Sequence, residues 1–317
     1  MADDLAAWAR ERAPALRARA EAEAVAALRD ALVAAALSEE RMRARTPAPP
    51  PPPEPAGEGI WVYGILRGDA PALPTGVAST PVERVTAADL SALVSRVPLA
   101  EFGAEPLRRN LNDLAWLEEV ARAHEAVLDA ALREATVVPL RMCTIFEREQ
   151  RVREMLEREH DALVEALGAL DGRQEWGVKV LADRDSLERQ ARAGMDAPAE
   201  RGGTEGGAYL ERRRFERNVR ERAGALAADV ADQVHARVQD WAVDAVTRPP
   251  QNPELSGHEG EMLLNGAYLI DADRVDGLRD LVADLEERHR ALGVRIELTG
   301  PWPPYNFAPR GDAAALA

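Results

Sequence analysis

The segments GAYLI (266–270) and RIELTGPWPPYNF (295–307) decide the expected fold of the C-terminal half of this chain. From Val294 into the second segment, apolar and polar side chains alternate as they do in a half-buried strand. The next residues place Trp302, Tyr305 and three prolines in a short stretch that ends at Phe307. A stretch this stiff and apolar is a poor linker, so we expect it to pack against the fold.

The residues around these segments predict an α+β domain at 173–317. A strand is expected at 175–182, where the sequence is EWGVKVLA, and a long apolar stripe predicts a helix over 209–246. The stretch 273–293 predicts a second helix, with Asp273 as its N-cap and Gly293 at its C-terminal end. A further strand at 245–248 would complete the order β-α-β-β-α-β of a ferredoxin-like, split βαβ domain.

Residues 60–172 predict a separate α+β domain that contains a small mixed sheet and two long helices. The strands are recognised by short runs of β-branched and aromatic residues, and the helices by apolar residues three or four positions apart. The predicted elements are strands at 60–66, 82–85, 92–97 and 136–146, and amphipathic helices at 110–134 and 147–170.

Three residues of this N-terminal domain attract attention as candidate site residues. His124 lies on the apolar face of the first helix, and no nucleophile or carboxylate motif accompanies it, so we expect a core histidine with one hydrogen-bonded nitrogen rather than a catalytic one. Pro139 interrupts its strand and is expected at a sheet edge or a bulge. Arg141 is expected to pair with Glu118 or Glu125, with anion binding as the weaker alternative.

The N-terminal 59 residues differ in character from the rest of the chain. Residues 1–45 are rich in Ala, Glu and Arg and predict an amphipathic helix, or two helices that break near Pro14. Residues 46–59, TPAPPPPPEPAGEG, predict a stiff polyproline linker. The apolar stripe of the helix is narrow, and both a partner helix and a loosely attached helix remain open interpretations.

Composition and motifs exclude several classes of function. A net charge of −15 argues against general binding of nucleic acid or anionic membranes, because affinity for phosphate comes from concentrated Lys and Arg. The single cysteine, Cys143, excludes an internal disulfide, and neither a signal peptide nor a membrane-spanning run is recognisable. The five histidines have no metal-ligand spacing, and no dinucleotide fingerprint or nucleophile elbow occurs. The sequence thus predicts a soluble cytoplasmic protein with no catalytic, cofactor or metal site.

Six segments occur in an order and at a spacing that resemble the gas vesicle protein family F/L. The segments are WVYGI (61–65), ARAHEAVL (121–128), VVPLRMCTIF (137–146), EWGVKV (175–180), GAYLI (266–270) and LTGPWPPYNF (298–307). The resemblance covers about residues 60–307, and its most distinctive part is the last segment. Two departures are Met142 and Cys143, which stand where the family commonly carries Phe and Gly.

The resemblance implies a non-enzymatic role in forming the gas vesicle. It implies a minor vesicle component that contacts the hydrophobic major shell protein and other accessory proteins, and a two-domain architecture with a ferredoxin-like C-terminal part. The aromatic residues Trp302, Tyr305 and Phe307, and the apolar edge near Pro139, are then candidate partner contacts. Their other interpretation is structural, with the aromatic residues fixing the C-terminus onto the core.

Two other classes of function compete with the assembly role. A ferredoxin-like enzyme or small-ligand regulator predicts a cleft with converging titratable residues between the two domains. A nucleic-acid binder would need a continuous basic surface, which the charge balance disfavours. The assembly role instead predicts an exposed apolar patch.

Overall fold

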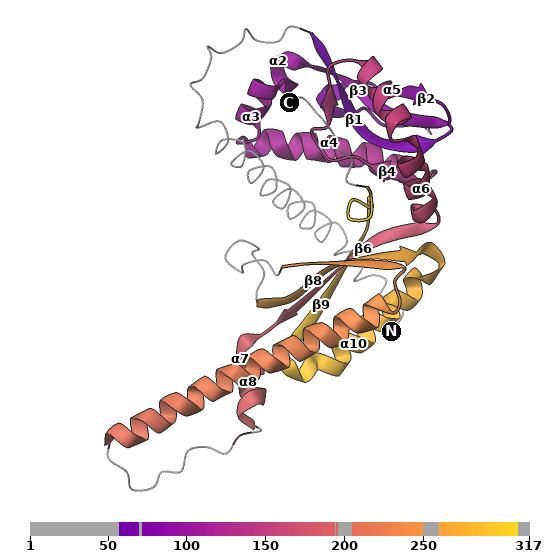
Figure 1. The fold of residues 1–317 in the computed structure, drawn as a ribbon. Coiled ribbons are helices and arrows are strands. Elements are labelled where there is room, and N and C mark those ends of the chain that lie inside the picture. Colours follow the sequence, from indigo (N-terminus) through magenta and orange to yellow (C-terminus); the bar gives the residue numbers. More distant parts are fainter. Residues whose placement is uncertain (1–56, 70–71, 194, 196–204, 250–259, 310–317) are drawn as a thin grey trace, which may run out of the picture. The chain divides into compact units, whose positions relative to one another are not determined.

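The computed structural model describes residues 57–69, 72–193, 195, 205–249 and 260–309, and these residues form two compact units (Figure 1). Unit 1 runs to Asp171 and resumes at Pro303, whereas unit 2 spans Gly172–Trp302. The predicted helix at 1–45 and nearly all of the predicted linker at 46–59 lie outside the described residues. The last residues of that linker prove to belong to a strand, since the first strand begins at Glu58.

Unit 1 is built on a sheet whose central strand is β1 (Glu58–Arg67). β1 pairs with β3 (Leu90–Pro98), with β4 (Val137–Pro139) and, near its start, with β5 (Ile145–Phe146), while β2 (Glu83–Ala87) pairs with β3. Every one of these pairings is antiparallel, so the prediction of a mixed sheet was wrong. The reason is that β3 and β4 run in the same direction but are separated by β1, which leaves no parallel neighbours.

The helices of unit 1 are more broken than the sequence predicts. The first predicted helix, 110–134, is α4 (Leu114–Leu132), and two shorter helices that were not predicted, α2 (Leu99–Phe102) and α3 (Ala104–Asn110), precede it. Asp113 caps α4 by accepting from the N–H groups of Ala115 and Trp116, which starts a new helix after the break. The second predicted helix is α5 (Glu149–Arg158) followed by α6 (His160–Leu170). Neither Pro nor Gly stands at the break at Glu159, and nothing local explains it.

The predicted strand at 136–146 is two short strands, β4 and β5, joined by a turn at 140–144. Thr144 closes this turn, since its N–H and hydroxyl both donate to the Arg141 carbonyl. Cys143 within it adopts the left-handed conformation, with φ of 66°. A chain that must turn here cannot continue the ladder, and therefore β5 pairs with β1 at a separate place.

Unit 2 consists of a four-stranded antiparallel sheet and three helices among the described residues. The strand order is β7-β8-β6-β9. In chain order its elements are β6 (Arg173–Ala182), α7 (Arg184–Ala193), α8 (Glu205–Gln239), β7 (Asp244–Arg248), β8 (Glu261–Asp271), α10 (Val275–His289) and β9 (Val294–Trp302). The anticipated strand at 245–248 is β7, and the long predicted helix therefore ends earlier, at Gln239.

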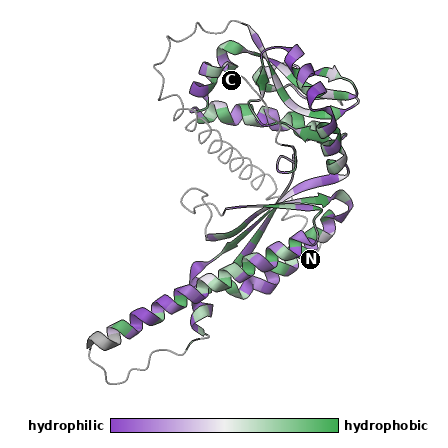
Figure 2. Cartoon of the chain, in the orientation of Figure 1, coloured by the Kyte–Doolittle hydropathy of each residue, from purple (hydrophilic) through white to green (hydrophobic). Residues whose placement is uncertain are grey.

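The helices α8 and α10 cover one face of this sheet (Figure 1). Their buried stripes, which include Val230 and Leu278, pack against Tyr268 and Ile270 of β8. Figure 2 shows that hydrophilic residues dominate the beginning of α8. None of the helices in the described part of the chain combines the length and the hydropathy of a membrane span.

The ends of α10 test two predicted caps. Gly293 follows the helix and its short 3-10 extension with φ of 67°, as expected for a C-terminal glycine. Asp273 is not the N-cap, because it lies inside the 3-10 turn Ala272–Arg274 that precedes α10.

Candidate functional site

The tail, Pro303–Ala308, returns to unit 1 and lies against α4. Tyr305 packs against the core of unit 1, and its hydroxyl donates to Glu125 Oε1 at 2.9 Å. The tail is folded into a tight turn by its own backbone, since the N–H groups of Phe307 and Ala308 both reach the Pro304 carbonyl. Phe307 is half-buried. Proline and a half-buried aromatic ring thus give this short segment a fixed conformation.

Trp302 lies apart from these two aromatic residues, at the end of β9 in unit 2. It is opposite Glu175 in the sheet, and its Nε1 donates to Thr299 Oγ1 at 3.2 Å. The ring is half-buried. The three aromatic residues of the distinctive segment therefore divide between the two units.

His124 is in the core of unit 1, with 1% of its surface exposed. Trp61 Nε1 donates to its Nδ1 at 3.0 Å, and therefore the ring proton is on Nε2. Within the described part of the chain Nε2 has no hydrogen-bond partner in range, although it lies toward the Leu140 carbonyl. Burial lowers the pKa of His124 from 6.5 to about 4. The histidine is neutral at physiological pH and closed off from solvent, which leaves it no access to a substrate.

Pro139 lies in β4 at the edge of the sheet, as predicted, and it is buried opposite Gly64 of β1. The strands approach closely here: a Cβ added at Gly64 would lie 2.7 Å from Val137 Cγ1 and 3.0 Å from the Val138 carbonyl oxygen. Glycine at this position permits the contact between the short edge strand and β1.

Arg141 does not form the predicted ion pair. Its side chain is exposed, and among the described residues it makes no ion pair. Both expected partners have other contacts, because Glu118 pairs with Arg122 one turn along α4 and Glu125 accepts from Tyr305. The Arg141 carbonyl is held in the turn at 140–144 by Thr144, and its side chain is left exposed there.

Cys143 has a buried thiol in the same turn, and burial raises its pKa to about 12. The thiol therefore stays protonated and unreactive. Its positive φ explains why Gly is suited to this position, since Gly adopts the left-handed conformation without a steric cost.

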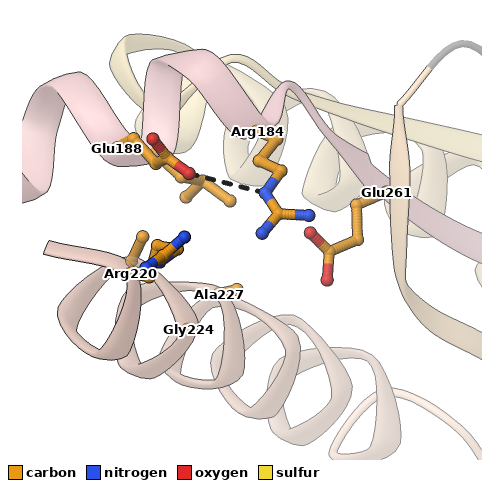
Figure 3. Close-up of a pocket in the computed structure, with 8 residues that line it drawn as sticks. Arg184, Glu188, Arg220, Gly224, Ala227 and Glu261 are labelled. Carbon is orange, nitrogen blue, oxygen red and sulfur yellow. Dashed lines mark ion pairs between the residues drawn. The ribbon is translucent and has the colours of Figure 1, made fainter. Parts of the chain in front are cut away.

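A small pocket lies between α7, α8 and the start of β8 (Figure 3). Arg184 lies between Glu188 and Glu261, with Arg220 facing it from α8, and Arg184 Nε is 3.5 Å from Glu188 Oε1. The volume is about 110 Å³. Pockets that hold cofactors or drug-sized ligands measure about 300–1,000 Å³, so this one fits only an ion or a very small molecule. Its four charged side chains also neutralise one another.

The sequence did not predict the lining of this pocket, because most residues of α7 are polar. The signal that marks α7 is the buried pair Leu187 and Ala191, four positions apart. Within the described residues, no group of three His, Cys, Asp or Glu side chains is placed to hold a metal ion.

Large apolar side chains are exposed at a few places on the described surface. Tyr209 and Leu210 are adjacent near the beginning of α8, with 54% and 57% of their surface exposed, and Leu114 at the start of α4 is 58% exposed. The Arg213 guanidinium lies 5.8 Å from the centre of the Tyr209 ring, one turn along the helix. Val243, just before β7, is also exposed. These positions were not singled out by the sequence pattern, because their residue types also occur in helix cores.

Comparisons with known proteins agree on one family across both units. The family described as "Gas vesicle synthesis protein GvpL/GvpF" matches residues 59–309. Gas vesicle protein L of Streptomyces sp. (strain CB03234) is 37% identical over 251 residues, which is 78% of this chain and 92% of that protein. Gas vesicle protein F of the same strain is 30% identical and covers 78% of this chain and 98% of its own length.

Solved structures agree in fold. The crystal structure of the gas vesicle protein GvpF from Anabaena sp. PCC7120 superposes with a TM-score of 0.60 at 21% identity, covering 80% of this chain and 97% of that one. GvpF from Microcystis aeruginosa gives 0.57 at 19% identity, with 79% and 99% covered. The sequence match spans 59–309 and therefore includes both units and the tail, and on this ground the chain belongs to the gas vesicle synthesis protein family GvpL/GvpF.

Proposed function

We propose that this protein is a non-enzymatic accessory protein of gas vesicle formation, which acts in the cytoplasm and at the vesicle by binding the hydrophobic major shell protein and other accessory proteins. The observation that carries the proposal is the family match over both units and the tail. The named relatives are gas vesicle proteins L and F, and the enclosed, neutral state of His124 is consistent with a role that needs no chemistry.

A physical reason for such a partner lies in the properties of a shell subunit. Subunits with large apolar surfaces aggregate before assembly unless another protein covers these surfaces. A partner with a net charge of −15 keeps the complex in solution by repulsion between complexes. The proposed role therefore needs a limited apolar contact on an otherwise charged protein.

The beginning of α8 supplies such a contact. Tyr209 and Leu210 are exposed next to each other, and the surrounding helix is rich in Arg and Glu, which keeps the segment soluble. We therefore place the shell contact at Tyr209 and Leu210. Tyr305 and Pro139 are assigned to the fold, because one packs on the core and the other is buried in the sheet. Trp302, Phe307 and Arg141 retain accessible surface and are secondary contact candidates.

We also infer that unit 2 is a ferredoxin-like domain and that the predicted helical extension at 1–45, followed by a linker that ends before Glu58, precedes a two-domain body. The inference about unit 2 is supported by its strand order, β7-β8-β6-β9, and by the helices α8 and α10 on one face of the sheet. In this topology β6 and β7 run in the same direction with β8 between them, which is the split βαβ arrangement.

The alternative, a small-ligand regulator or enzyme, has less support. The pocket of unit 2 is small, the charges of its two arginines and two glutamates balance, and Arg184 already pairs with Glu188. A binding site for a cofactor-sized ligand would need a larger apolar cavity with a few converging polar groups.

The proposal is tested by co-expression with the major shell protein, followed by affinity capture of this chain. We expect the shell protein to be captured in soluble form by the wild type and to be lost with the double change Tyr209→Ser and Leu210→Ser. Leu114→Ser is the matched control, since it removes an equally exposed apolar residue from α4 and should leave capture unchanged. A variant that lacks residues 1–56, and so leaves β1 whole, tests the predicted extension separately. If the wild type fails to capture the shell protein, the proposed function is wrong; if both serine variants capture it equally, only the placement at α8 is wrong.

A further inference from the structure

The first residue of α6, His160, links this helix to the turn between β2 and β3. Its Nε2 lies 2.7 Å from Oδ1 of Asp89 in that turn, 71 positions earlier in the chain, and its Nδ1 lies 3.0 Å from Asp161 Oδ1. Glu159, at the break before α6, has non-helical dihedral angles, so α6 begins as a separate helix beside this contact. The ring therefore attaches the start of α6 to the sheet of unit 1.

The two contacts determine the protonation state of the His160 ring. An ionised carboxylate can only accept hydrogen bonds, and a neutral imidazole has one N–H to donate. Asp89 is ionised, because the hydrogen bonds from His160 and Arg67 lower its pKa to about 2. Hydrogen bonds to both carboxylates require a proton on both ring nitrogens, and His160 that makes them is therefore the charged imidazolium.

Asp89 is held in place by contacts that do not involve His160. Its second oxygen, Oδ2, accepts from Nε of Arg67 in β1 at 2.6 Å. The backbone closes the same turn, since the Gly68 N–H donates to the Asp89 carbonyl. Because other contacts fix this acceptor, it stays in position when the histidine ring loses a proton.

The charged groups around the ring favour its protonated form. Hydrogen bonds to Asp161 and Asp89 raise the pKa of His160 above its usual value of 6.5. On α5, Arg158 pairs with Glu159, and β4, which also packs on α6, has no ionisable side chain. The N-terminal end of a helix disfavours a cation, and the two carboxylates outweigh this effect.

We propose that His160 is a proton-dependent clasp, which holds the start of α6 to the turn between β2 and β3 when it is charged and loses one of its two carboxylate contacts when it is neutral. A neutral ring keeps a single N–H and presents a lone pair to the other carboxylate. Because the folded-state pKa is raised, the clasp is complete below pH 6.5 and is lost as pH rises through the raised pKa. Solvent reaches the ring directly, since 33% of the side chain is exposed. This inference is independent of the proposed shell contact.

Hydrogen exchange of the full-length chain at pH 6 and at pH 8.5 tests the clasp. The quantity measured is the protection factor of peptides from 159–167, which corrects for the intrinsic dependence of exchange on pH. We expect this protection factor to fall by about two- to fivefold between the two pH values, because contacts between partly exposed charged groups contribute modestly. His124 does not interfere, since its pKa of about 4 leaves it neutral at both.

Substitutions at His160 separate the charge of the ring from its other contributions. His160→Gln carries no charge and should show the lower protection at both pH values, whereas His160→Arg stays charged and should keep the higher protection at both. Asp89→Asn should also show the lower protection at both. Glu165→Gln, which removes a carboxylate from an exposed position of the same helix, should behave as the wild type does. Equal protection of the wild type at the two pH values, or a fall that persists in His160→Gln or His160→Arg, would overturn the proposal.

Discussion

Unit 1 should lose stability as pH falls through the range in which free histidine titrates, because His124 is buried in its neutral form. Its pKa is lowered from 6.5 to about 4, so between these values the unfolded chain binds a proton that the folded chain excludes. Stability contributed by the neutral ring is complete above pH 6.5 and is lost as pH falls toward 4. With 1.36 kcal/mol per pH unit, the loss is about 2 kcal/mol at pH 5 and about 3 kcal/mol at pH 4.

The matched variant for this prediction is His124→Asn, which keeps an acceptor near the Trp61 Nε1–H and removes the titrating group. The measurement is urea unfolding at pH 7.5 and at pH 5. Hydrogen exchange in peptides from β1 monitors the unfolding, so that the free energy obtained is that of unit 1 and not that of unit 2. The wild type should lose about 2 kcal/mol more than His124→Asn between the two pH values. Equal losses in the two proteins would refute the argument that His124 is held neutral by burial. The comparison also removes the opposite contribution of His160, whose raised pKa is unaffected by the substitution.

Three further predictions concern the packing of unit 1. Tyr63→Phe should cost about 1–3 kcal/mol in unfolding free energy, because it leaves the buried Val77 N–H without its 2.8 Å acceptor and removes the donor to Ser95. Gly64→Ala should lower the unfolding free energy by about 1–3 kcal/mol, because the added methyl group would press against β4. As a control, Gly168→Ala should raise it by about 0.5–1 kcal/mol in the same thermal melts, because Gly168 is exposed within α6 and its added methyl group would have no neighbouring atom within 4 Å. Cys143→Val should lower the unfolding free energy by about 1–3 kcal/mol, because a β-branched residue is forced to positive φ. Cys143→Gly should change the unfolding free energy by less than about 1 kcal/mol. Equal melting temperatures for the two variants would contradict the argument that the backbone at 143 is strained.

Local pattern was sufficient for much of the fold. The alternation around GAYLI and Val294 predicted β8 and β9, and the need to complete a β-α-β-β-α-β order located β7. The buried face of a single helix or strand determines which of its residues are apolar, so the spacing of apolar residues nearby in the sequence is enough to predict the element. The short helix α7 was not predicted, because its apolar stripe contains only two buried residues.

The remainder depends on contacts between residues far apart in the chain. The sequence showed that the proline-rich tail must pack on something, but the contact between Tyr305 and Glu125 spans 180 positions and has no local signature. Arg141 was assigned a partner from proximity along the chain, whereas the turn at Cys143 directs its side chain to solvent. The candidate contact at Tyr209 and Leu210 was not predicted, because their exposure depends on how α8 packs and the same residue types also occur in helix cores.

The division of unit 1 between the two ends of the chain has a consequence for synthesis. Tyr305 packs on the core of unit 1 beside α4, and it leaves the ribosome only after all of Gly172–Trp302 has been translated. At roughly 5–20 residues per second, this interval is on the order of ten seconds. During that time the nascent N-terminal unit exposes the apolar surface that its own last residues will cover, so a chain truncated before the tail would be released with this surface open to chaperones and proteases.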